Sequence, residues 1–181
     1  MINNLFNQLI ITITPFLPRW IVWKIAGRYV AGETSAKALA VVRQLNDKGY
    51  SATVDILGEH TNSKSEAAEI TREYMNIYDE ISKQQLDCNI SIKPSHIGQD
   101  ISNEILQTNL DKLLLKAEET NNFLRIDMEN STVTDNTISL YKSYRKKYKN
   151  VGTVFQAYLY RTQTDLEQLS QNGSFNFRLC K

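Results

Sequence analysis

The chain has few of the residues that mark secreted scaffolds, fibrous proteins or disordered segments. Among its 181 residues are only three prolines, seven glycines and two cysteines, Cys88 and Cys180, which lie far apart in the sequence. A disulfide framework and a cysteine zinc site are therefore disfavoured, and collagen-like or Pro/Gly-rich disordered classes are excluded. With so few cysteines, a reducing cytoplasm is the expected location.

An excess of charge of one sign is also missing. The sequence has 21 basic and 20 acidic residues, for a net charge near +1. This balance gives no excess of basic residues for binding nucleic acid, so we expect no nucleic-acid partner. The length fits one domain of ordinary size and is short for two, and a hydrophobic share of 41% suffices for a core.

Acidic residues are absent before Glu33, where an apolar run extends over residues 9–23. The basic residues follow this run instead of preceding it, unlike in a signal peptide, and two prolines and an arginine interrupt it, unlike in a membrane span. Two interpretations stay open. The segment packs on its own domain, or it makes peripheral contact with the inner face of the cell membrane.

Hydrophobic periodicity alternates between helical and strand patterns along the chain. Helices are expected before residue 50 and over 63–84, 100–120, 133–148 and 164–171. Strands are expected over 51–57, 89–94, 122–127, 151–158 and 175–180. We therefore divide the chain into an N-terminal helical arm, 1–50, and a βα domain, 51–181.

Such alternation implies parallel strands joined by right-handed crossovers. A βα barrel and an open doubly wound sheet both satisfy it. The run ILGEHTNSKSE after the first strand lacks the GxGxxG pattern, so a dinucleotide-binding Rossmann unit is disfavoured. No HExxH or GxSxG pattern marks a zinc hydrolase or a serine hydrolase, and we expect no metal site.

Polar residues recur where the strands end, which is where parallel βα proteins carry their chemistry. They are Asp55, Glu59, Lys93, Ser95, His96, Asp127, Glu129, Gln156, Arg178 and Lys181. Each one alone fits a solvated residue or a structural ion pair. Together they indicate a polar site of mixed sign, suited to a small zwitterion or to a cofactor with polar edges.

Six runs in this order carry a family resemblance. They are RYVAGET (28–34), DILGE (55–59), SIKPSHIG (91–98), LRIDMENS (124–131), VFQAYLYRT (154–162) and FRLCK (177–181). The chain resembles the monofunctional bacterial proline dehydrogenases from about residue 15 to its last residue. The resemblance implies a distorted (βα)8-type barrel that holds FAD, oxidises L-proline to 1-pyrroline-5-carboxylate and passes electrons to a membrane quinone.

The resemblance also implies roles for individual residues. Lys93 corresponds to a substrate-contacting lysine, and we expect neighbouring strands to place it close enough to Asp127 for the two charges to pair. Asp127 and Arg178 look like the family's active-site acid and strand arginine, and both are expected to be catalytic. Flavin contacts fall on Met128, Gln156 and Lys181, the last as the first residue of the family's Lys-Gly-Ala-Tyr run.

The sequence departs from the family pattern after Lys181, where Gly-Ala-Tyr and a later helix with paired arginines would follow. We therefore expect an amino-terminal portion of about five strands, whose activity alone is in question. Two other hypotheses stay open. One is a flavin-free βα-barrel lyase or aldolase that uses Lys93 as a Schiff-base nucleophile. The other is a non-catalytic remnant.

Overall fold

The computed structural model describes residues 12, 18, 30–171 and 173–181. Its contacts divide the chain into two units, Met1–Gln44 and Leu45–Lys181. Helix α3, Ser35–Asn46, is the described part of the expected helical arm. The apolar run over 9–23 lies outside the described residues apart from two positions, so its role stays a prediction. Among the described residues, no helix is long and apolar enough to cross a membrane.

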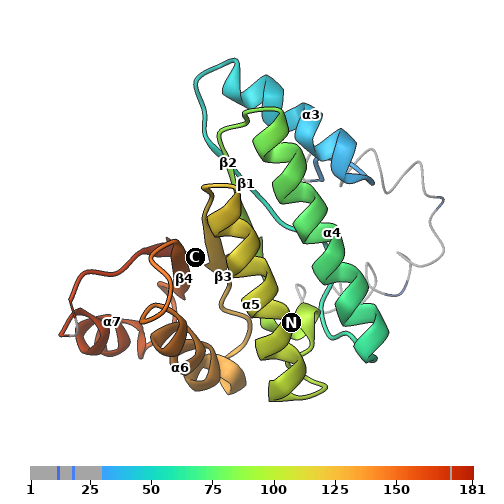
Figure 1. The fold of residues 1–181 in the computed structure, drawn as a ribbon. Helices are drawn as coiled ribbons and strands as arrows, with labels where there is room; N and C mark the ends of the chain where they lie inside the picture. The colour runs from blue at the N-terminus through green and yellow to red at the C-terminus, as the bar shows by residue number, and fades with distance from the viewer. Residues whose placement is uncertain (1–11, 13–17, 19–29, 172) are drawn as a thin grey trace. The chain divides into compact units, whose positions relative to one another are not determined.

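The second unit is built on a five-stranded sheet in which every neighbouring pair of strands is parallel. The strands lie in sequence order and are β1 (Ala52–Val54), β2 (Cys88–Ile92), β3 (Leu124–Ile126), β4 (Val151–Gln156) and β5 (Phe177–Cys180). All five expected strands are present, and each is shorter than expected by one to four residues. The predicted parallel βα arrangement is confirmed (Figure 1).

A helix follows each of the first four strands. These helices are α4 (Lys64–Lys83), α5 (Asn103–Glu119), α6 (Thr134–Tyr144) and α7 (Thr162–Ser170), with short 3-10 turns η2 (Pro94–Ile97) and η3 (Ser131–Val133). The S-x-x-E spacing at the start of α4 works as expected, because Ser63 Oγ accepts the Glu66 amide at 3.2 Å. The Glu66 carboxylate in turn accepts the Asn62 amide at 2.9 Å.

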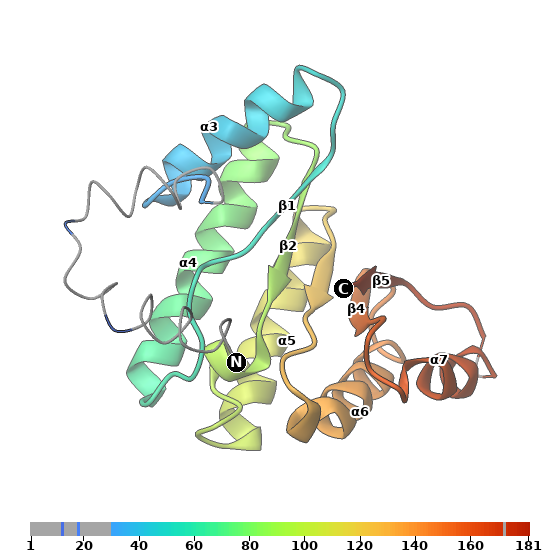
Figure 2. The same ribbon diagram turned by 180° about the vertical axis from the view of Figure 1, so that it is seen from behind.

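The core lies between the helices and one face of the sheet. In Figure 2, α4 and α5 lie behind β1 to β3, whose opposite face is toward the viewer. Alternate strand residues such as Ile90, Ile92, Leu124 and Ile126 are fully buried and form the helix-facing side. The side chains between them project to the other face, and they include the polar residues that the sequence singled out.

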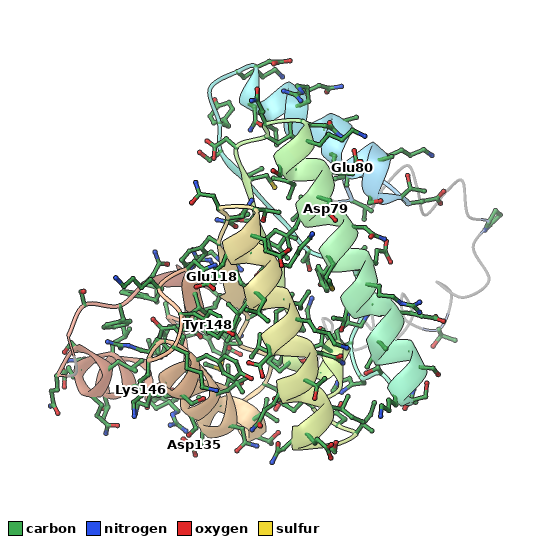
Figure 3. The ribbon with its side chains drawn as sticks, in the orientation of Figure 1. Asp79, Glu80, Glu118, Asp135, Lys146 and Tyr148 are labelled. Carbon is green, nitrogen blue, oxygen red and sulfur yellow. The ribbon has the colours of Figure 1, made fainter. Side chains whose placement is uncertain are left out.

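Charged side chains lie on the outer surfaces of the helices. Lys116 of α5 forms a 2.7 Å ion pair with Asp79, which is labelled on α4 in Figure 3. Because Asp79 is more than half exposed, this pair contributes at most about 1 kcal/mol. The apolar contacts beneath it hold the two helices together.

Candidate active site

The strand register brings three charged residues into one row on the inner face of the sheet. Lys93 and Asp127 each follow directly after the last paired residues of β2 and β3. By the same register Asp127 lies beside Val154, which pairs with Arg178 of β5. Paired residues of parallel strands project to the same face. Lys93, Asp127, Val154 and Arg178 are therefore side by side, and we call them the charged row.

Asp127 and Arg178 form the central contact of the charged row. Arg178 Nη2 donates to Asp127 Oδ1 at 3.0 Å, across the strand that separates them. Val154 is only 4% exposed beneath this pair. The hydroxyl of Ser91 donates to the same oxygen, Oδ1. Two donors from two strands thus fix one oxygen of the carboxylate.

The environment of Asp127 makes its charged form costly. Burial raises the pKa of this carboxyl above its ordinary value, and the nearby Asp55 charge adds to the rise. The hydrogen bond from Ser91 and the charges of Arg178 and Lys93 lower the pKa, but they do not offset the burial. A carboxylate whose pKa is moved by burial and by specific partners is typical of a functional site.

Lys93 has a different partner from the one expected. Neighbouring strands suggested an ion pair between Lys93 and Asp127, but Lys93 Nζ pairs with Asp55 Oδ2 at 3.2 Å. In the strand register Asp127 lies beside Lys93 and Asp55 lies beside Ser91. Ser91 and Arg178 already donate to Asp127, and the long Lys93 side chain extends diagonally to Asp55 instead. The Lys93 side chain is 20% exposed and the Asp55 side chain is 41% exposed, so this ion pair is accessible to a ligand.

Gln156 lies at the last residue of β4, beyond the charged row. Its Nε2 donates to the carbonyl oxygens of Met128 and Glu129, at 3.2 and 3.3 Å. Two carbonyl neighbours on one side fix the amide orientation, so its oxygen projects away from them. Met128 and Gln156, both expected to contact a flavin, are therefore next to each other and both buried.

Lys181 is exposed at the end of β5. Its carbonyl accepts the Tyr158 amide at 2.9 Å, which continues the ladder one step past the strands. The structure places Lys181 at the carboxyl end of the sheet, near the end of β4. Its expected contact with a flavin stays a prediction.

Three polar residues of the same face were not among the strand-end residues that the sequence pattern indicated. Ser91, Arg125 and Asn176 each lie two positions before a residue of the charged row. Arg125 Nη1 donates to Asn176 Oδ1 at 3.0 Å, and burial together with the charge of Arg178 lowers the pKa of Arg125. Counting back by two along each strand would have found all three, because side chains alternate between the faces.

The loops after β1, β2 and β3 are joined around Ser95. Its amide donates to Glu129 Oε2 at 3.0 Å, and its hydroxyl donates to the other oxygen of that carboxylate. Its carbonyl accepts the amide and the hydroxyl of Thr61, at 3.3 and 3.1 Å. Ser95 and Glu129 thus have the structural role that we considered for each strand-end residue alone.

His96, next to Ser95, is buried in the same loop region. It is 5% exposed, and burial and the charge of Lys93 lower the pKa of its imidazole. Gly58 lies against the ring, where any Cβ at position 58 would meet it. His96 therefore packs beneath the loop that follows β1, in surroundings that disfavour its charged form.

Comparison with known proteins gives a consistent result. Residues 38–178 match the model of the proline dehydrogenase family. Proline dehydrogenase 2 of Bacillus subtilis is 38% identical over 156 residues, which cover 86% of this chain and 51% of that protein. Proline dehydrogenase of Deinococcus radiodurans is 31% identical over 191 residues, which cover 100% of this chain and 61% of that protein. The chain thus spans about half the length of its Bacillus relatives.

Solved structures show the same arrangement of elements. Proline utilization A (PutA) from Bdellovibrio bacteriovorus, inactivated by N-propargylglycine, matches with a TM-score of 0.72 and 25% identity. The match covers 84% of this chain and 19% of that one. PutA from Corynebacterium freiburgense matches with a TM-score of 0.70 and 22% identity, over 98% of this chain and 20% of that one.

These matches decide between the two architectures that the strand pattern allowed. The five parallel strands and their helices are part of a proline dehydrogenase βα barrel and do not form an open doubly wound sheet. The family model spans all five strands up to Arg178, and with it the charged row. The chain therefore belongs to the proline dehydrogenase family.

Proposed function

We propose that this chain contributes the first half of an FAD-dependent proline dehydrogenase. The enzyme oxidises L-proline to 1-pyrroline-5-carboxylate, the first step of proline breakdown to glutamate, and passes the electrons to a membrane quinone. The observation that carries the proposal is the charged row, located at the carboxyl ends of parallel strands in a chain of this family.

The charges of the inner face suit a zwitterionic substrate. Lys93 and Arg178 supply positive groups, while Asp55 and Asp127 supply negative groups within the same few ångströms. Lys93 is the residue proposed to contact the proline carboxylate. Asp127 and Arg178 are proposed as catalytic, and Arg178 would offset the negative charge of the flavin once it has accepted electrons from the substrate.

Polar atoms left without partners support a flavin beside β4 and β5. Arg178 Nε is buried and has no hydrogen-bond partner in the described part of the chain. The amide oxygen of Gln156 is likewise directed away from its two carbonyl neighbours. These groups, with Met128 and Lys181, would hold the FAD, which supplies the two-electron acceptor when bound.

The lyase or aldolase hypothesis is less well supported. A Schiff-base lysine attacks as a neutral amine, usually in a desolvated pocket or beside another cation. Lys93 is instead paired with the Asp55 carboxylate at 3.2 Å. We therefore propose an electrostatic role for Lys93 and no covalent one.

Anaerobic titration with L-proline tests the proposal. We expect the protein, purified with FAD in the full length that its gene encodes, to lose its flavin absorbance near 450 nm as about one equivalent of proline is added. A flavin that stays oxidised in excess proline would refute the proposal. Borohydride trapping of a carbonyl compound on Lys93 in the same sample would favour the lyase instead.

A further inference from the structure

Asp127 is held on one side only. Both hydrogen bonds that the protein donates to its carboxylate, from Ser91 Oγ and Arg178 Nη2, go to Oδ1. Within the described part of the chain, Oδ2 accepts no hydrogen bond. The carboxylate therefore has one oxygen committed to the protein and one oxygen available to a ligand or a proton.

The two donors to Oδ1 differ in how firmly they are themselves held. Arg178 has a long, flexible side chain that is 37% exposed. Ser91 is 2% exposed on β2, an inner strand that pairs with both β1 and β3. A buried hydroxyl on a short side chain has few alternative positions, so Ser91 is the donor that defines the direction of the carboxylate.

We propose that Ser91 is a positioning residue, whose hydroxyl holds Asp127 Oδ1 so that Oδ2 faces the substrate space of the charged row. This inference rests on the proposed function for its catalytic consequence. Whether the Ser91 hydroxyl orients and stabilises the charged Asp127 carboxylate can be tested without measuring turnover.

Removal of the Ser91 hydroxyl is expected to move the titration of Asp127 to higher pH. That hydrogen bond favours the charged form of Asp127 and is the strongest of the effects that lower its pKa. The other charged or titratable groups that act on Asp127 come from β1, α4, β2, β3 and β5 or directly follow these elements, and the substitution does not remove them. They are Asp55, Tyr74, Lys93, Arg125 and Arg178. Without the hydroxyl, the titration of Asp127 shifts upward.

The test follows the Asp127 carboxyl carbon by NMR in the 181-residue chain labelled with ¹³C-aspartate, with Asp127→Asn used to assign the signal. We expect Ser91→Ala to move the midpoint of this titration to higher pH. The matched control is Ser51→Ala, which removes a serine–aspartate hydrogen bond to Asp87 before β2 begins and is expected to leave the Asp127 midpoint in place. An unchanged midpoint in Ser91→Ala would overturn the proposal.

A second variant covers the case in which Ser91→Ala does not fold. Ser91→Cys keeps nearly the same shape and replaces the hydroxyl with a weak donor, so the same upward shift is expected. Thr at position 91 restores a hydroxyl, and Ser91→Thr is expected to return the midpoint toward that of the wild type. A shift in Ser91→Thr as large as that in Ser91→Cys would assign the effect to packing and would contradict the role of the hydroxyl.

Turnover separates this inference from the proposed function. In the full-length protein with FAD, we expect Ser91→Ala to lower kcat/KM for L-proline about tenfold, the usual effect of losing one hydrogen bond to a charged group. A shifted midpoint in a protein that never oxidises proline would refute the function and support the positioning. Normal turnover in Ser91→Ala, with an unchanged midpoint, would support the function and refute the positioning role of Ser91.

Discussion

Gly58 offers a quantitative test of how the loop after β1 is packed. Its φ of +151° lies in a region that residues with a Cβ rarely adopt. A Cβ built on it would also lie 2.7 Å from His96 Cε1, well inside contact distance. Because the His96 ring is 5% exposed, it cannot move aside without disturbing its neighbours.

Two costs therefore add in Gly58→Ala. Backbone strain at such a φ costs about 1–3 kcal/mol, and forcing extra volume into a packed site costs about another 1–3 kcal/mol. The expected loss in the free energy of unfolding is about 2–6 kcal/mol. Gly49→Ala is the control, since Gly49 has a φ of +83° but nothing within 4 Å of the added Cβ. It should lose only the strain, about 1–2 kcal/mol.

Urea unfolding followed by far-UV circular dichroism measures both variants. A double-mutant cycle with His96→Ala then isolates the clash, and we expect a coupling free energy of at least about 1 kcal/mol. Equal losses in Gly58→Ala and Gly49→Ala, with no coupling to His96→Ala, would show that the ring does not confine this loop.

Two further predictions concern Asp127 and the flavin. Because burial raises the pKa of Asp127 in the folded protein, the stability that this group contributes is fully present below its ordinary pKa of 3.8 and is lost as pH rises through the raised value. Asp127→Asn should therefore gain stability relative to the wild type between about pH 3 and pH 7 in urea titrations, and a gap that is constant or shrinks with pH would contradict this. The 181-residue polypeptide alone should bind FAD weakly and show little thermal stabilisation by it, because β1 and β5 are open edges and the outer side chains Phe177 and Leu179 are 41% and 56% exposed. Gel filtration with added FAD checks this, and a yellow monomer with a clear rise in Tm would contradict it.

The sequence pattern was sufficient to predict a parallel sheet covered by helices, because each local signal agreed with it. Ser63 and Glu66 marked the start of α4, and the apolar alternation of Ile90 and Ile92 marked an inner strand. The barrel and the doubly wound sheet could not be separated by pattern alone, because both alternate strand and helix in the same way. The choice between them depended on the family.

The site was predictable as a set of positions but not as a set of contacts. Strand ends indicated Lys93, Asp127 and Arg178, yet the partner of Lys93 proved to be Asp55. Asp127 lies beside Lys93 in the strand register, but Ser91 and Arg178 already donate to it. Such contacts between residues far apart in the chain cannot be read from the sequence around Lys93. Ser91 was missed for a related reason, because a serine inside a strand has no distinctive pattern until the strand's inner face is known.

Steady-state oxidation of L-proline by Asp127→Ala tests the central claim, that the charged row performs this chemistry. The assay uses the full-length protein with FAD, follows reduction of a redox dye and identifies 1-pyrroline-5-carboxylate as the product, with the exposed Asp79→Ala on α4 as the control. We expect Asp127→Ala to lose about 100-fold or more of kcat/KM while keeping the wild-type circular dichroism spectrum, and Asp79→Ala to retain wild-type turnover. Proline oxidation by Asp127→Ala at the wild-type rate would contradict the account.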